Sequence, residues 1–125
     1  MYYYFQPNSK DHNNEIGDCV IRAICKVSGK SWKEVFDALC IIARARQSLP
    51  NYSDVFSQYL ESFGYKHKVV KKKLTVKYAS LLSKSNKRLV MRCEGHLVAA
   101  IDGDYYDTWD SGKKVVKEIW ICDNK

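Results

Sequence analysis

The hydrophobic period of the chain changes near Tyr65, and this change limits the folds that the chain can adopt. Before Tyr65, apolar residues recur every three or four positions, which is typical of helices with one buried face. After residue 86, apolar and polar residues alternate over short runs, which is typical of strands. Helices followed by strands predict an α+β fold in which N-terminal helices pack on a C-terminal antiparallel sheet. The 125 residues suit a single domain spanning 1–125.

Two consecutive helices are expected early in the chain. The first spans about residues 18–27 and ends at Gly29, because glycine readily takes the left-handed conformation that closes many helices. The second begins at Ser31, where Ser31 and Glu34 have the spacing of a capping box. Gly17 and Asp18 are turn and cap residues, so they place the start of the first helix immediately after Gly17.

A third helix and several strands are expected in the rest of the chain. The helix follows Pro50, with Asn51 or Ser53 as its cap and Phe63 in its buried stripe. Strands are expected over residues 2–5, 65–70, 88–92, 96–101, 105–109 and 115–121. Residues 102–104, Asp-Gly-Asp, are typical of a hairpin turn between two of them.

Composition limits the compartment and the partners. Five scattered cysteines do not form a disulfide framework and indicate reduced thiols, so a cytoplasmic protein is expected. No apolar run has membrane-spanning length, and no membrane partner is expected. The formal net charge of +7 is compatible with a solvated basic surface or with an acidic partner such as nucleic acid.

Cys19 is the first candidate for chemistry. Gly17 and Asp18 are turn and cap residues, so they deliver Cys19 to the first turn of a helix. Unpaired N–H groups and the positive end of the helix dipole meet there, and both lower the pKa of a thiol. The thiolate is the reactive form, so Cys19 is a candidate nucleophile; the alternative is an ordinary buried cysteine.

His96 is the second candidate, because it begins the most apolar predicted strand. If the helix packs on the sheet, His96 can reach Cys19 and activate it. A third group should then accept a hydrogen bond from the other ring nitrogen. With 102–104 as a three-residue loop, the hairpin register places Asp110 opposite His96. Asp107 is the alternative if the register differs by one residue or if a strand carries a bulge.

Three motifs occur in the order Cys, His, Asp: Gly17-Asp18-Cys19, Gly95-His96-Leu97-Val98-Ala99-Ala100 and Tyr106-Asp107-Thr108-Trp109-Asp110-Ser111. In this order the chain resembles the papain-like cysteine peptidase superfamily, in particular its small single-domain bacterial and phage members, and it is similar in plan to the peptidases that trim bacteriocin leaders. The resemblance implies a papain-like fold, with Cys19 as nucleophile, His96 as general base and acid, and Asp110 as orienter of the imidazole. It implies a protein or peptide substrate, a thioester intermediate, and neither a cofactor nor a metal.

The oxyanion hole is less defined than the three motifs. In the family, a glutamine shortly upstream of the nucleophile supplies one donor. Here the backbone N–H of Cys19 should supply one hydrogen bond. The side-chain amide of the second donor is left open among Gln6, Asn8, Asn13 and Asn14.

Three alternative functions remain open at the level of sequence. The chain can be an inactive papain-like domain that binds proteins, for example a phage inhibitor. It can be a basic nucleic-acid-binding module, given the lysine-rich residues 66–73 and 84–88 and nine tyrosines. It can also bind zinc through Cys93 and His96 together with Cys19 or Cys122. We expect a cysteine-dependent hydrolase, a peptidase or isopeptidase; the sequence does not distinguish hydrolysis from acyl transfer or deamidation.

Overall fold

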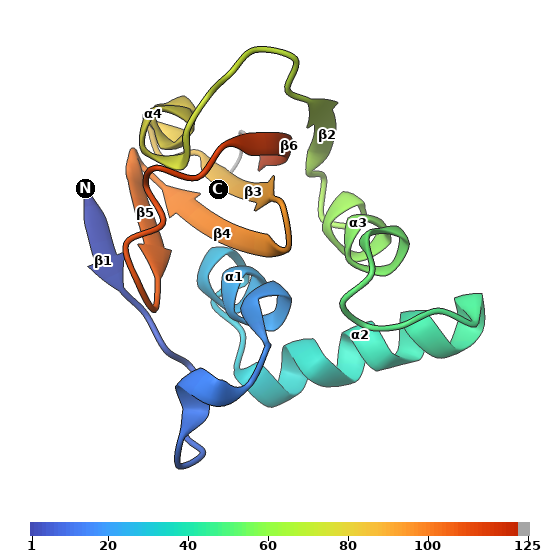
Figure 1. Ribbon diagram of the computed structural model, residues 1–125. Coiled ribbons are helices and arrows are strands. Elements are labelled where there is room, and N and C mark those ends of the chain that lie inside the picture. Colours follow the sequence, from blue (N-terminus) through green and yellow to red (C-terminus); the bar gives the residue numbers. More distant parts are fainter. Residues whose placement is uncertain (123–125) are drawn as a thin grey trace.

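The computed structural model describes residues 1–122 and confirms the α+β class (Figure 1). The helices are α1 (Cys19–Ser28), α2 (Trp32–Arg46), α3 (Ser53–Glu61) and the short α4 (Val76–Ala79), with 3₁₀ turns at Asn13–Glu15 and Ser80–Ser83. The strands are β1 (Tyr2–Tyr4), β2 (Lys66–Val69), β3 (Arg88–Cys93), β4 (His96–Ile101), β5 (Asp104–Asp107) and β6 (Val116–Cys122). The expected elements are therefore present, with small shifts at their ends.

The strands form one sheet in the order β1-β5-β4-β3-β6-β2. All neighbouring pairs are antiparallel except β1 and β5, which are parallel. The sheet is therefore mixed: the strands of the C-terminal half are antiparallel, as expected, and the parallel pairing comes from the N-terminal β1. Because β1 and β5 are separated by most of the chain, no hairpin forces them to run in opposite directions.

Apolar side chains cover both faces of the central strands. On β3 and β4, Val90, Leu97 and Ala99 belong to the cluster under α1, α2 and α3. Their alternate neighbours contribute to the cluster on the other face, beside α4: Leu89, Met91, Val98 and Ala100. The period of two along each strand produces these two layers. In Figure 1, α1 lies against the centre of the sheet, which brings the start of this helix close to the start of β4.

The helix caps agree with the sequence in two places and differ in a third. Gly29 takes the left-handed conformation (φ 73°) and donates to the carbonyl of Cys25. Ser31 and Glu34 form the expected capping box. The N-cap of α3, however, is Tyr52, neither Asn51 nor Ser53, and its side chain makes no cap hydrogen bond.

Phe63 is not part of the buried stripe of α3. The helix ends at Glu61, so Phe63 lies in the turn that follows and is 52% exposed. Its ring packs edge-on against Tyr59, with centroids 5.1 Å apart. The apolar spacing predicts Phe63 on the buried face, but α3 ends at Glu61, two residues before Phe63.

The β4–β5 hairpin has a shorter turn than the sequence led us to expect. Ile101 pairs with Asp104, so the turn contains only Asp102 and Gly103. Both turn residues have positive φ (51° and 90°), as in the turns that suit the right-handed twist of a hairpin. The expected three-residue loop is therefore wrong, and the register differs by one residue from the one that placed Asp110 opposite His96.

None of the helices within residues 1–122 combines the length and apolar content needed to cross a bilayer.

Candidate active site

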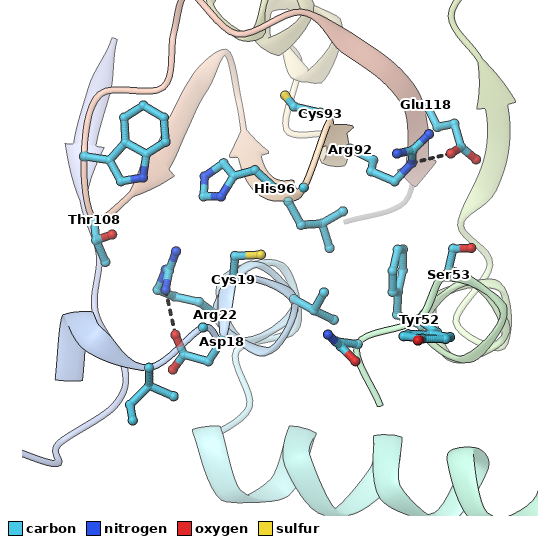
Figure 2. Close-up of a pocket in the computed structure, with 18 of the residues that line it drawn as sticks. Asp18, Cys19, Arg22, Tyr52, Ser53, Arg92, Cys93, His96, Thr108 and Glu118 are labelled. Carbon is cyan, nitrogen blue, oxygen red and sulfur yellow. Dashed lines mark hydrogen bonds and ion pairs between the residues drawn. The ribbon is translucent and has the colours of Figure 1, made fainter. Parts of the chain in front are cut away.

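Cys19 is the first residue of α1 and lies half-buried at the edge of a cavity. The cavity has a volume of about 700 Å³ and separates the start of α1 from the start of α3. Figure 2 shows Cys19 next to the His96 ring at one end of the cavity, with Tyr52 and Ser53 toward the other end. The structure thus brings together the two side chains that the sequence placed far apart.

The thiol of Cys19 lies beside the imidazole of His96 and the backbone of Leu97. Burial opposes ionisation of the thiol, but the polar groups of His96 and Leu97, together with the positive charges of His96 and Arg22, outweigh it. The pKa of Cys19 is therefore lowered from its ordinary value. Both the position at a helix start and the neighbouring imidazole favour the thiolate.

His96 uses its other side to bind an acid. Its Nε2 lies 2.6 Å from Oδ2 of Asp107, which leaves Nδ1 for the thiol. Burial alone lowers the pKa of His96, but the hydrogen bonds to Asp107 and Cys19 outweigh burial and raise it to about 9. An imidazolium between a thiolate and a carboxylate is the arrangement that activates a cysteine nucleophile.

Asp107 is 2% exposed and its carboxylate is fully hydrogen-bonded. Oδ2 accepts from the hydroxyl of Ser111 at 2.6 Å as well as from His96, and Oδ1 accepts from the backbone N–H of Thr108 at 2.8 Å. Burial raises the pKa of Asp107, but the hydrogen bonds from His96 and Ser111 outweigh it and lower the pKa. The carboxylate therefore stays ionised beside the imidazole.

Asp110 does not contact His96, so the expected pairing is wrong. Its Oδ1 accepts from the hydroxyl of Tyr105 at 2.5 Å and from the backbone N–H of Gly112 at 3.0 Å. The register of the two-residue turn, continued beyond the paired residues, places Trp109 and not Asp110 opposite His96. Asp107, the alternative, reaches the ring from the end of β5. Asp110 instead stabilises the loop after β5.

Trp109 covers the imidazole, a contact that the sequence analysis missed. Its ring centroid lies 5.2 Å from that of His96, at an interplanar angle of 37°. The indole is 47% exposed, so it shields the His96 ring while its outer face meets solvent. The sequence signal that could have revealed this contact is the position of Trp109 between the two candidate acids, Asp107 and Asp110.

Arg22 is the second residue that the sequence analysis missed. It donates to Asp18 at 2.7 Å and to Asp107 at 3.3 Å, and all three side chains are buried. Asp18 also accepts from the indole N–H of Trp32 at 2.8 Å. The i,i+4 spacing of Asp18 and Arg22 was the signal that could have revealed the first of these contacts.

Only one of the four candidate amides for the oxyanion hole borders the cavity, namely Asn14. Its Oδ1 accepts from Nε2 of Gln6 at 2.7 Å, which leaves its own amide hydrogens as donors. Asn8 donates to Asp18, and Asn13 donates to the carbonyl of Asn8. Gln6 therefore contacts Asn14 and not the cavity, and the remaining two support the loop that precedes α1.

Within residues 1–122, no group of three or more His, Cys, Asp or Glu side chains is arranged to hold a metal ion. Cys93 borders the same cavity but is fully buried and belongs to the apolar cluster on the α4 side of the sheet, whereas Cys19 packs against the opposite cluster. The described residues therefore offer no ligand set for the zinc alternative.

Comparisons of the chain with protein-family models, with curated proteins and with solved structures give no match. A function must therefore be inferred from the Cys19–His96–Asp107 cluster and from the cavity that it borders.

Proposed function

We propose that the protein is a cysteine-dependent hydrolase of papain-like plan, a peptidase or isopeptidase with Cys19, His96 and Asp107 as its triad. One observation carries the proposal: a largely buried imidazole lies between a half-buried thiol, whose pKa it lowers, and a buried carboxylate that it contacts at 2.6 Å, at the wall of a cavity. A structural cysteine needs no such partners. The order Cys, His, Asp along the chain supports the papain-like plan.

The geometry supports acyl transfer through a thioester. The Cys19 thiolate attacks a substrate carbonyl carbon, and the carbonyl oxygen becomes an oxyanion. His96 then donates its proton to the leaving amine as the C–N bond breaks, which leaves an acyl-thioester on Cys19. Water attacks the thioester, His96 accepts a proton from it, and the carboxylic acid leaves while the thiolate is restored.

Two donors can stabilise the oxyanion in this reaction. The N–H of Cys19 lies in the first turn of α1, where backbone donors have no helical acceptor. The side-chain amide of Asn14 borders the same cavity. Removing one such donor typically costs about 10²- to 10³-fold in rate, so Asn14→Ala tests this assignment.

The cavity fits a peptide better than a small charged metabolite. Its volume of about 700 Å³ lies within the range of ligand pockets. Charged side chains along it are already paired within the protein, as Arg92 is with Glu118 and Asp54 with Arg46. Phe56 and Leu97 add apolar wall, so a mostly uncharged peptide segment suits the cavity.

A reducing cytoplasm is part of the proposal. All five cysteines are free, and the mechanism requires Cys19 as a thiolate.

A thiol-directed activity probe tests the function. A peptidyl fluoromethyl ketone should label the wild-type protein at Cys19 alone, as located by peptide mapping, and Cys19→Ala should abolish labelling. Cys40→Ala is the matched control, because Cys40 has similar half-burial on α2 but no imidazole partner. Fluorogenic peptides that the wild type hydrolyses and Cys19→Ala does not would define the substrate. Labelling that is spread over several cysteines would contradict the proposal.

A further inference from the structure

A buried arginine lies next to the candidate active site and joins two carboxylates. Arg22 lies three residues after Cys19 on α1, and its guanidinium contacts Asp18 Oδ1 at 2.7 Å and Asp107 Oδ1 at 3.3 Å. The side chains of Asp18, Arg22 and Asp107 are 2%, 8% and 1% exposed. We call these three residues the ion triad.

The ion triad connects the two elements that carry the reacting groups. Asp18 is the N-cap of α1, immediately before Cys19, and Asp107 is the last residue of β5. Arg22 therefore ties the nucleophile helix to the end of the strand whose carboxylate holds His96 (Figure 2 shows its contact with Asp18). The planar fork of an arginine suits this task, because its separate N–H groups can bind two acceptors in fixed directions.

Stability alone is a weak reason for this arrangement. A buried ion pair loses so much solvation that well-packed apolar residues in its place are often as stabilising. The contact on Asp107 does have a consequence for the site. Oδ1 is held by Arg22 and the N–H of Thr108, so Oδ2 is directed toward His96 and Ser111.

We propose that Arg22 is a positioning residue: by binding Asp18 and Asp107 together it fixes α1 against β5, so that Cys19 and His96 meet in the reactive geometry. This inference rests on the proposed function. It assigns Arg22 a role that acts through Asp107 and His96, without contact with the substrate.

The other charged side chains at the cavity already have partners of their own. Arg92 pairs with Glu118 from β6, and Glu118 also binds His67 from β2. Asp54 at the start of α3 pairs with Arg46 of α2. The remaining thiol at the cavity, Cys93, is buried with its pKa raised to about 11, chiefly by burial.

Within the ion triad, one positive charge faces two negative charges. The positive charge of Arg22 is among the causes that lower the pKa of Cys19. It follows that loss of Arg22 should affect both the geometry and the charge balance of the Cys19–His96 pair.

The test compares Arg22→Gln and Arg22→Lys with the wild type. The rate of Cys19 alkylation is followed from pH 5 to 10 by peptide mapping, and the His96 ring is titrated by ¹H–¹⁵N NMR. For Arg22→Gln we expect the acid limb of the alkylation profile to rise by roughly 0.5 to 1 pH unit, with an altered His96 titration. Arg22→Lys should restore the acid limb in part, since it keeps the charge but cannot span both carboxylates.

Arg88→Gln is the matched control. Arg88 is half-buried and also ties the sheet to α1, but at the far end of the helix, where it donates to the carbonyl of Val27 at 2.6 Å. This variant should lower the melting temperature and leave both pH profiles unchanged. An equal shift in Arg88→Gln would show that Arg22 is merely structural and would overturn the inference.

Two further outcomes decide the matter. If Arg22→Gln folds and matches the wild type in both pH profiles, the inference is wrong. If Arg22→Gln does not fold, Arg22→Lys decides, and wild-type pH profiles of Arg22→Lys refute the inference. Failure of the proposed function is a separate result, seen in the wild type as a Cys19 that reacts no faster than Cys40. In that case the His96 titration of the Arg22 variants still tests whether the ion triad positions the imidazole.

Discussion

Two cysteines on the same helix have opposite chemical environments. Cys19 begins α1 at the cavity, while Cys25 lies near its other end, 2% exposed in the apolar cluster. Burial, together with the negative charges of Asp18 and Glu34, raises the pKa of Cys25 to about 11. Burial acts in the same direction on Cys19, but the neighbouring polar groups of His96 and Leu97 outweigh it and lower the pKa of Cys19. The difference shows that specific polar partners, and not the degree of burial, separate a candidate nucleophile from a core thiol.

Removal of the imidazole should have the largest effect on this comparison. In His96→Ala, Cys19 loses its principal partner and should behave like an ordinary buried thiol. We expect peptide hydrolysis to fall by about 10²- to 10⁴-fold, the range typical of a lost general acid–base group. The assay is turnover of a fluorogenic peptide by folded protein, with circular dichroism to confirm the fold. Activity within a few fold of the wild type would refute the role of His96.

Replacement of the acid should have a smaller effect and should distinguish two nearby aspartates. Asp107→Asn keeps the shape of the side chain but removes the charge beside His96, so activity should fall, although by less than in His96→Ala. Asp110→Asn is the matched control: it disturbs the bond to Tyr105 but no group at the cavity, so activity should stay near that of the wild type. The opposite ranking of the two variants would contradict the assignment of Asp107.

The pH dependence of stability should report the environment of His96. Its pKa in the folded protein, about 9, lies above the ordinary value of 6.5. The protonated ring is therefore stabilised by folding, so its contribution is complete below about pH 6.5 and is lost as the pH rises through about 9. Urea unfolding from pH 6 to 10 should show a decline in the wild type that is smaller in His96→Gln. Parallel curves for the two proteins would contradict the raised pKa.

The smallest effect is expected from the hairpin turn that sets the register. Gly103 has φ +90°, and an added Cβ would lie 3.1 Å from Cγ of Lys84. Gly103→Ala should therefore destabilise the protein by about 1 kcal/mol, chiefly through backbone strain. Thermal unfolding measures this change, while Cys19 labelling should be retained. A stability equal to that of the wild type would argue against the two-residue turn.

The sequence predicted the parts of the molecule that depend on local pattern. The helices, the strands, the capping box of Ser31 and the placement of Cys19 at a helix start follow from spacing and residue type. The meeting of Cys19 with His96 was predicted from the order of helix and sheet, and the structure brings the two together. The catalytic roles of these residues stay a prediction.

The remaining features depend on geometry that a single sequence does not specify. The hairpin loop is one residue shorter than expected, and a shift of one places Trp109 rather than Asp110 opposite His96. Asp107 reaches the ring from the end of β5, a contact that loop length alone does not predict. The parallel pairing of β1 with β5 and the contact of Arg22 with Asp107 join segments about 85 residues or more apart. Local periodicity carries no information about such pairs.

The relative rate at which Cys19 and Cys40 are alkylated tests the central claim most directly. Native protein at about pH 6.5 is treated with a limiting amount of iodoacetamide, and each cysteine is quantified by peptide mapping. Since the neighbouring His96 and Leu97 lower the pKa of Cys19, Cys19 should react at least about ten times faster than Cys40, and His96→Ala should abolish the difference. Equal rates in the wild type, or a Cys19 that reacts only after unfolding, would contradict the account.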